Sequence, residues 1–196
     1  MQSLTIESLL DRLQPDVLAI AEPSYEDLDI QWDSYQLLKG YIQKGSKIRL
    51  NILIKNNIKF TQSYWRVEVP NLTLKLDDWT ITFAYREWAK CGHQSSKTMV
   101  HQMERWSKFV MRWSQEKGKR RMLMGDLNFD YWLTDGSQMH LKPIRDLVHD
   151  TISAGGWYQL IKEPTRYQNQ SVSCLDHLYS RSVNDLVFIK NENETG

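Results

Sequence analysis

The sequence predicts one domain of the α/β class, in which helices pack on a β-sheet. Its length of 196 residues is enough for one sizeable core and too little for two ordinary domains. Runs typical of strands fill the first half, whereas helix-like and strand-like segments alternate in the second. Eight tryptophans favour a layered core over a slim helical bundle. We therefore expect residues 1–196 to form a single domain.

Composition narrows the class of protein further. The hydrophobic fraction of 41% and the charged fraction of 25% are those of a globular protein. The net charge is +1, so binding to nucleic acid would require a local basic surface. Cys91 and Cys174 lack metal-ligand spacing, and we interpret them as small buried residues in a reducing compartment. We find no signal peptide or membrane span, and expect a nuclear or cytoplasmic protein without a membrane partner.

The first half of the chain is predicted to form one helix and then strands. Apolar residues at helical spacing predict a helix over residues 6–13, which Pro15 ends. The apolar run 17–21 predicts a buried strand that ends at Glu22. Residues 25–39 should contain a loop and a short strand. The further strands that we predict, with short polar turns that favour antiparallel pairing, cover residues 48–55, 65–69, 72–76 and 79–85.

The second half alternates helices with strands. Residues 97–117 form the clearest helix, with an apolar stripe from Met99 to Trp113 that should face the core and with Gly118 as its C-cap. Another helix is expected over residues 143–154, because Pro143 suits the first turn and two glycines follow the end. The strands predicted here cover residues 122–124, 157–161, 173–178 and 186–189.

Polar residues stand where several predicted strands end, which is where sheet enzymes place functional groups. These residues are Glu22, Tyr85, Asp126, Asn128 and the pair Asp176–His177. Carboxylate and amide oxygens are the ligands that Mg²⁺ prefers. Asp126 and Asn128 would share one face if their segment is extended, and Gly125 would allow the backbone to approach a ligand closely. The sequence therefore predicts an oxygen-rich cation site.

Cleavage of a phosphodiester bond requires three things that this set can supply. A metal neutralises the charge on the phosphate and leaving group, and Glu22 with Asp126 could bind it. A water has to be oriented and deprotonated, which suits Asp126 and Asn128. A donor has to stabilise the charge of the transition state, which suits Tyr85.

At these residues the sequence resembles the endonuclease/exonuclease/phosphatase superfamily, and within it the apurinic-like endonuclease domain of non-LTR (LINE-type) retrotransposons. The matching segments, PDVLAIAE, AYR, GDLNFD and SCLDH, occur in family order at residues 15–22, 84–86, 125–130 and 173–177. The likeness to retroelements comes from residues 85–88 and 163–166. Together these segments span nearly the whole chain, and their order is more specific than any single motif.

The resemblance implies two β-sheets packed face to face with flanking helices, as in DNase I. It also implies Mg²⁺ as the cofactor with Mn²⁺ as an alternative, DNA as the substrate, and a reverse transcriptase fused to or downstream of the domain in the parent element. By resemblance Glu22 binds metal, Tyr85 contacts phosphate, and Asp126 with Asn128 activates water. Asp176 corresponds to the aspartate that orients the catalytic histidine of the family.

The sequence departs from the family pattern at both ends. The first family strand with its asparagine and the terminal Ser-Asp-His motif have no counterpart, so the resemblance implies an incomplete domain. His177 directly follows Asp176 and is expected to be structural. Arg86 and Arg166 are the candidate substrate-binding cations. The basic run 117–121 could bind phosphate, but we favour a solvated helix end.

Three functions remain open from the sequence. The first is a Mg²⁺-dependent DNA endonuclease derived from a retroelement. The second is an inactive remnant that binds nucleic acid or protein, which the missing histidine motif favours. The third is a small-molecule phosphatase or phospholipase of the same superfamily, against which residues 85–88 and 163–166 argue.

Overall fold

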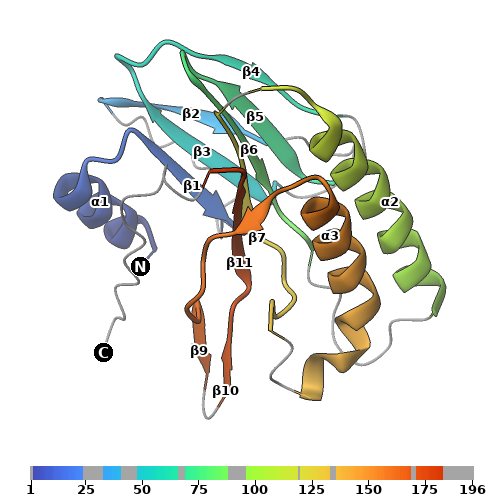
Figure 1. The fold of residues 1–196 in the computed structure, drawn as a ribbon. Helices are drawn as coiled ribbons and strands as arrows, with labels where there is room; N and C mark the ends of the chain where they lie inside the picture. The colour runs from blue at the N-terminus through green and yellow to red at the C-terminus, as the bar shows by residue number, and fades with distance from the viewer. Residues whose placement is uncertain are drawn as a thin grey trace.

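Two β-sheets stack on one another, and two long helices cover the outer face of the larger sheet (Figure 1). This arrangement is seen in a computed structural model that describes residues 2–23, 33–40, 48–65, 69–87, 96–118, 120–132, 136–168 and 171–182. The architecture confirms the α/β fold class with face-to-face sheets and flanking helices.

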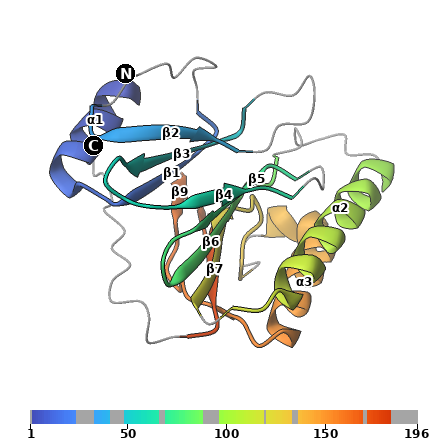
Figure 2. The same ribbon diagram turned by 90° about the horizontal axis from the view of Figure 1, so that it is seen from above.

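The smaller sheet is three-stranded and antiparallel, in the order β1–β3–β2. Its strands are β1 (Val17–Ala21), β2 (Tyr35–Lys39) and β3 (Leu50–Lys55). Helix α1 (Gln2–Leu13) precedes them, begins earlier than predicted and lies beside this sheet (Figure 2). β1 is half-buried rather than buried as we expected, because it is an edge strand.

The larger sheet is six-stranded, in the order β4–β5–β6–β7–β11–β8. Its strands are β4 (Thr61–Ser63), β5 (Asn71–Lys75), β6 (Trp79–Ala84), β7 (Arg120–Asp126), β8 (Tyr158–Gln159) and β11 (Asp176–Ser180). Among the strands that the structure describes, only β6 and β7 pair in parallel, because helix α2 (Ser96–Gln115) connects them. The predicted antiparallel pairing is confirmed for β5 with β6, whereas most of the strand predicted over residues 65–69 lies outside the described residues.

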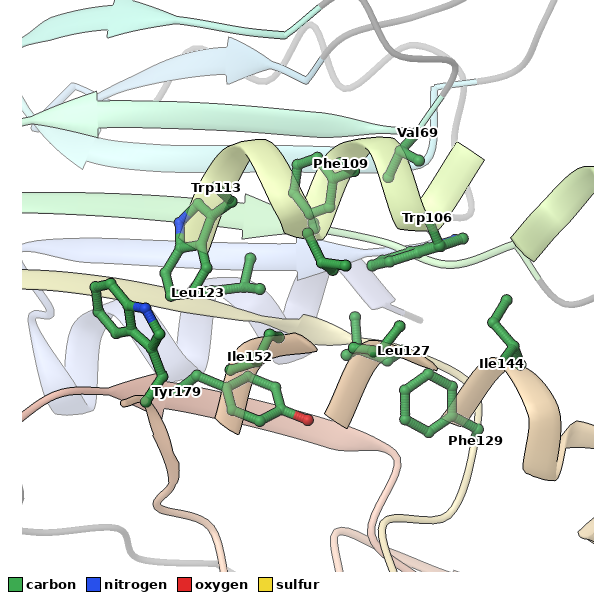
Figure 3. Close-up of a cluster of buried hydrophobic side chains, with 14 of the residues drawn as sticks. Val69, Trp106, Phe109, Trp113, Leu123, Leu127, Phe129, Ile144, Ile152 and Tyr179 are labelled. Atoms are coloured by element: carbon green, nitrogen blue, oxygen red, sulfur yellow. The ribbon is translucent and has the colours of Figure 1, made fainter. Parts of the chain in front are cut away.

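Two apolar clusters hold the layers together. Between the sheets pack Leu50, Ile52 and Ile54 of β3 with Leu72, Leu74 and Phe83 of the larger sheet. On the other face of that sheet, α2 and α3 (Lys142–Ala154) bury the second cluster (Figure 3). Its members include Trp106, Phe109, Val110, Trp113, Leu123, Leu127, Ile144, Val148 and Ile152. The larger sheet is therefore buried on both faces, so we look for a functional site at the ends of its strands.

Three predicted element boundaries need correction. Helix α2 ends at Gln115, so Gly118 is not its C-cap. The predicted strand 173–178 is two strands, β10 (Ser171–Ser173) and β11, because the chain turns at residues 174–175 from a hairpin into the sheet. The strand predicted over residues 157–161 shrinks to β8, and the one over 186–189 lies outside the described residues. β9 (Arg166–Gln168) pairs with β10 in the hairpin, which projects from the body of the domain (Figure 1).

Candidate active site

An open cleft lies where β1 and β7 end and β11 begins. It has a volume of about 400 Å³ and is lined by Glu22, Asp126, Asn128, Thr165, Arg166, Leu175 and Asp176. Glu22 follows β1 of the smaller sheet, whereas Asp126 and Asp176 lie on neighbouring strands of the larger one. The structure thus brings Glu22, Asp126, Asn128, Asp176 and Arg166 together, although they are far apart in the sequence.

The turn after β7 brings Asp126 and Asn128 into direct contact. The Asn128 N–H donates to Asp126 Oδ1 at 2.9 Å, and Asn128 has a left-handed backbone with φ of +50°. The segment is therefore a turn at this point, and not the extended strand on which we expected the two side chains to share a face. The Asn128 side-chain amide donates to the Arg86 carbonyl at 2.7 Å, which ties the turn to the end of β6.

Gly125 serves the sheet rather than a ligand. Its φ is +152°, and a Cβ at this position would lie 1.7 Å from the carbonyl oxygen of Ala84. The close approach that we expected at Gly125 is therefore made to the neighbouring strand β6. No side chain fits there, because the obstacle is backbone that cannot move aside.

Glu22 is held by two donors on one carboxylate oxygen. Its Oε1 accepts a hydrogen bond from the Tyr85 hydroxyl and lies 3.5 Å from Arg49 Nη1. The backbone of Glu22 is left-handed, with φ of +48°. Such a conformation costs roughly 1–2 kcal/mol outside glycine and persists where the surroundings impose it. Tyr85 is fully buried and reaches the cleft through Glu22 rather than by lining it.

The carboxylates of the cleft perturb one another. Burial, followed by the charge of Asp176, raises the pKa of Asp126 to about 7, and Glu22 adds to this effect. The N–H of Asn128 and the charge of Arg166 act in the opposite direction. Burial also raises the pKa of Asp176, against a hydrogen bond with Thr165. Concentrated negative charge at neutral pH is the environment that a cation would relieve.

The donor set fits a hard divalent cation. Glu22 and Asp126 offer carboxylate oxygens in one cleft, and Mg²⁺ is usually bound by one or two carboxylates and several waters. Within the described ranges, no group of three or more His, Cys, Asp or Glu side chains could hold a metal ion. The arrangement therefore suits a partly hydrated cation on two carboxylates rather than a closed cage of protein ligands.

Arg86 does not face a substrate as we expected. Its side chain is only 2% exposed and lies beneath the turn that follows β7. Nη1 donates to the carbonyl oxygen of Asn128 at 2.8 Å, and Nη2 donates to Gln102 Oε1 of helix α2 at 3.1 Å. The guanidinium group donates to main-chain carbonyls and therefore has a structural role inside the protein.

Two residues that shape the cleft were not predicted from the sequence. Thr165 Oγ1 accepts hydrogen bonds from the N–H groups of Leu175 and Asp176, both at 3.0 Å, and so fixes the start of β11. Thr165 belongs to the segment 163–166 that resembles retroelements, which was the available signal. Arg49 gave no signal, because its contact with Glu22 depends on the pairing of β1 with β3.

His177 is structural, as predicted. It is 1% exposed, its Nε2 donates to the Phe129 carbonyl at 3.1 Å, and its Nδ1 accepts from the Tyr179 hydroxyl at 2.9 Å. Burial lowers the pKa of His177 to about 4, so the ring is neutral at physiological pH. Cys174 is buried as expected, and burial raises the pKa of its thiol to about 12.

In the basic run 117–121, Lys117 and Arg120 are exposed, as the favoured interpretation expects, whereas Arg121 is buried. Arg121 is 2% exposed and donates to the carbonyl oxygens of Trp113 and Glu116. The run lies at the start of β7, at the opposite end of this strand from Asp126.

The stacked sheets, with an acidic cleft at the ends of their strands, agree with the family comparison. The model of the Endonuclease/Exonuclease/phosphatase family matches residues 1–188, and the chain belongs to that family. A search of curated proteins found no match. Among the described residues, no helix is long and apolar enough to cross a membrane.

Solved structures show the same fold. The endonuclease domain of the telomere-specific non-LTR retrotransposon TRAS1 is 15% identical, with 87% of this chain and 74% of that chain covered and a TM-score of 0.56. An AP endonuclease from Archaeoglobus fulgidus is 13% identical, with coverage of 88% and 78% and a TM-score of 0.59. The 3'-5' exonuclease NExo from Neisseria meningitidis is 12% identical, with coverage of 91% and 81% and a TM-score of 0.64.

Proposed function

We propose that this chain is a Mg²⁺-dependent DNA endonuclease that hydrolyses phosphodiester bonds in the acidic cleft. The observation that carries the proposal is the convergence of Glu22, Asp126 and Asp176 with the amide of Asn128 from separate segments of the chain. Arg166 lies in the same cleft and supplies positive charge for a phosphate. Membership of the family supports hydrolysis as the type of reaction.

Glu22 and Asp126 are the residues that would hold the cation, with Mn²⁺ as an alternative to Mg²⁺. The bound ion would neutralise negative charge on the scissile phosphate and on the leaving oxygen. Tyr85 and Arg49 both contact Oε1 of Glu22, which leaves Oε2 as the oxygen that we assign to the cation. Tyr85 is buried and bonded to Glu22, so we assign it to holding that carboxylate, and its contact with phosphate stays a prediction from the resemblance.

Proton transfer from the attacking water is assigned to Asp126. Without a cation, burial and the charge of Asp176 raise the pKa of Asp126 to about 7, and a bound cation would lower this pKa and favour the carboxylate form that can accept a proton. Oδ1 of Asp126 accepts the Asn128 N–H, so Oδ2 is the oxygen that we assign both to the cation and to the attacking water beside it. Asn128 orients that water, and the neighbouring charge of Asp176 makes Asp126 more basic.

Two features favour a polymeric substrate over a small phosphate ester. The cleft is open and mostly polar, whereas sites for small molecules are concave and bury most of the ligand. The β9–β10 hairpin begins at Arg166, which lines the cleft, and projects from the body of the domain (Figure 1). Tyr167 and Val172 are cross-strand partners in it and are 56% and 45% exposed. An exposed aromatic residue beside a cationic one suits contact with bases and phosphates.

Nicking of supercoiled plasmid by the purified chain with Mg²⁺ tests the proposal. We expect relaxed circles with the wild type and none with Asp126→Ala or with EDTA. Asp77→Ala, the same substitution in an exposed turn before β6, is the matched control and should nick normally. Wild-type activity no higher than that of Asp126→Ala would contradict the endonuclease. Turnover of inositol phosphates or sphingomyelin without nicking would favour a small-molecule phosphatase or phospholipase.

One observation favours a second candidate, which is a domain that binds nucleic acid or protein without turnover. No histidine is among the described residues that line the cleft, and His177 bonds to Tyr179 and Phe129 instead. Fluorescence anisotropy with labelled DNA separates the two candidates. Binding without nicking would support the second candidate, whereas nicking would exclude it.

We also propose that the domain derives from a retroelement whose protein carries a reverse transcriptase. The segments 85–88 and 163–166 support this origin. Sequencing of the genomic locus tests it: an in-frame reverse transcriptase region or its decayed copy is expected downstream. Several complete loci without any such region would count against the proposal.

A further inference from the structure

A buried arginine ties the turn of the proposed active site to the sheet and to helix α2. Arg86 follows the end of β6, and its own N–H donates to the Asp126 carbonyl at 3.0 Å, which continues the β6–β7 pairing. Its Nη1 then reaches the carbonyls of Asn128 at 2.8 Å and of Leu127 at 3.4 Å. Gln102 of α2 accepts from Nη2 at 3.1 Å. One residue therefore holds three consecutive residues of the turn.

The tie is reciprocal between Arg86 and Asn128. The guanidinium of Arg86 donates to the main chain of Asn128, and the side-chain amide of Asn128 donates to the main chain of Arg86 at 2.7 Å. Both residues are buried, at 2% and 5% exposed, so water cannot readily replace these bonds. The left-handed backbone of Asn128 is thereby imposed from two sides.

We propose that Arg86 is a positioning residue that acts on catalysis through the Asn128 turn and so through Asp126, an inference that rests on the proposed endonuclease function. The Asn128 conformation aims its N–H at Asp126 Oδ1, which fixes the rotation of the carboxylate. Release of the turn would let the carboxylate and the Asn128 amide turn away from the water. Arg86 does not line the cleft, so its loss should slow turnover rather than weaken substrate binding.

Arginine is the residue type that this role needs. The guanidinium is a planar fork whose donors point in fixed directions, and it bonds here to main-chain carbonyls through one nitrogen and to Gln102 through the other. A lysine ammonium is a single point donor and could keep only part of this set. Lysine at this position should therefore restore some of the function that methionine loses.

The chain offers a matched control for loss of a buried arginine. Arg121 is equally buried, at 2% exposed, and its Nη1 also donates to two main-chain carbonyls. It lies at the opposite end of β7 from Asp126. Arg121→Met should therefore lower stability without changing the turnover of the folded molecules.

The test measures kcat and KM of plasmid nicking for folded Arg86→Met, Arg86→Lys, Gln102→Ala and Arg121→Met. Outer-shell partners typically contribute a factor of about 10–100, so we expect Arg86→Met to lose that much kcat with KM nearly unchanged. Arg86→Lys should fall between it and the wild type, and Gln102→Ala should show a smaller loss. If Arg86→Met does not fold, the kcat values of Gln102→Ala and Arg86→Lys are compared with that of Arg121→Met instead. The proposal is overturned if the folded Arg86 and Gln102 variants have the same kcat as Arg121→Met.

Amide hydrogen exchange by NMR keeps this test separate from the endonuclease proposal. The Asn128 N–H and side-chain amide should be protected in the wild type and lose protection in the Arg86 and Gln102 variants. Arg121→Met should leave this protection intact. If the wild type does not nick DNA, the proposed function fails, and unchanged Asn128 exchange in the variants would contradict the positioning role independently.

Discussion

Asp126 and Asp176 face each other directly across the antiparallel pair formed by β7 and β11. Like charges at directly opposed positions destabilise a sheet. The pKa of both carboxyl groups is raised by burial, and that of Asp126 also by the charge of Asp176. The fold thus keeps two mutually repelling carboxyl groups at the ends of these strands, which is expected where function and stability compete.

Burial of Asp126, together with the charge of Asp176, makes the stability of the domain depend on pH. The folded pKa of Asp126 is raised to about 7, so its contribution is fully present below the unfolded pKa of about 4 and is lost as the pH rises through about 7. We expect Asp126→Asn to be more stable than the wild type at about pH 8 in EDTA, with little gain at about pH 4. Urea unfolding at both pH values measures this. An equal difference at the two pH values would contradict it.

Binding of Mg²⁺ should stabilise the wild type selectively. A ligand present at 100 times its Kd adds about 2.7 kcal/mol to the free energy of unfolding. Thermal unfolding with and without MgCl₂, at constant ionic strength, should show a higher Tm for the wild type only. Glu22→Gln and Asp126→Asn should lose the shift, and Asp77→Asn should keep it. An unchanged wild-type Tm at millimolar Mg²⁺ would argue against the cation site.

Gly125→Ala should prevent folding or cost several kcal/mol of stability. The new Cβ would lie 1.7 Å from the Ala84 carbonyl oxygen, and the φ of +152° is unfavourable for alanine. Gly156→Ala is the matched control, since Gly156 also has a positive φ of +74° but nothing within 4 Å of a Cβ. That variant should lose only about 1 kcal/mol in urea unfolding. Similar losses in both variants would show that the contact with Ala84 is unimportant.

His177 should make the domain sensitive to acid. Its folded pKa is lowered by burial to about 4 from the ordinary histidine value of 6.5, so its contribution to stability is present above about 6.5 and is lost as the pH falls through about 4. The loss is on the order of 3 kcal/mol. His177→Gln should flatten this part of the stability profile, and the exposed His101→Gln should not. The free energy of urea unfolding between about pH 7 and pH 4 measures it.

Arg166 should contribute to DNA affinity through charge. It is exposed at the base of the β9–β10 hairpin and lines the cleft. We expect Arg166→Ala to weaken binding of a labelled duplex and to reduce the slope of log K against log salt by about 1. Lys75→Ala, at an exposed position on β5, should leave the slope unchanged. A salt slope equal to that of the wild type would remove Arg166 from the interface.

The sequence predicted the site residues where a strand-like run ended in a polar residue. Glu22, Asp126 and Asp176 follow or begin such runs, and the two stacked sheets bring the ends of those runs together in the cleft. Buried residues of the long helices were predictable for a similar reason, because the stripe from Met99 to Trp113 repeats with the helical period. Periodicity reports which face of an element is buried.

Periodicity cannot report how elements pair or what a buried charge bonds to. Arg86 was predicted to bind substrate, whereas its partners are carbonyls that only the folded turn presents. Gly125 was predicted to let the backbone approach a ligand, because neither segment alone reveals that β6 pairs with β7. Thr165 acts on the main chain of β11, a contact between segments without any local signature.

The hydrogen bond from Tyr85 to Glu22 joins the two sheets at the cleft. Tyr85 follows β6 of the larger sheet, Glu22 follows β1 of the smaller one, and the side chains of Ile52 and Phe83 pack in the layer between them. The distance between Glu22 and Asp126 is therefore set by how the sheets sit on one another. Some substitutions in the core, far from the cleft, would shift one sheet against the other. They would thereby change the distance between the proposed metal ligands. Variation in this interior layer could then alter reactivity while every residue of the cleft stays the same.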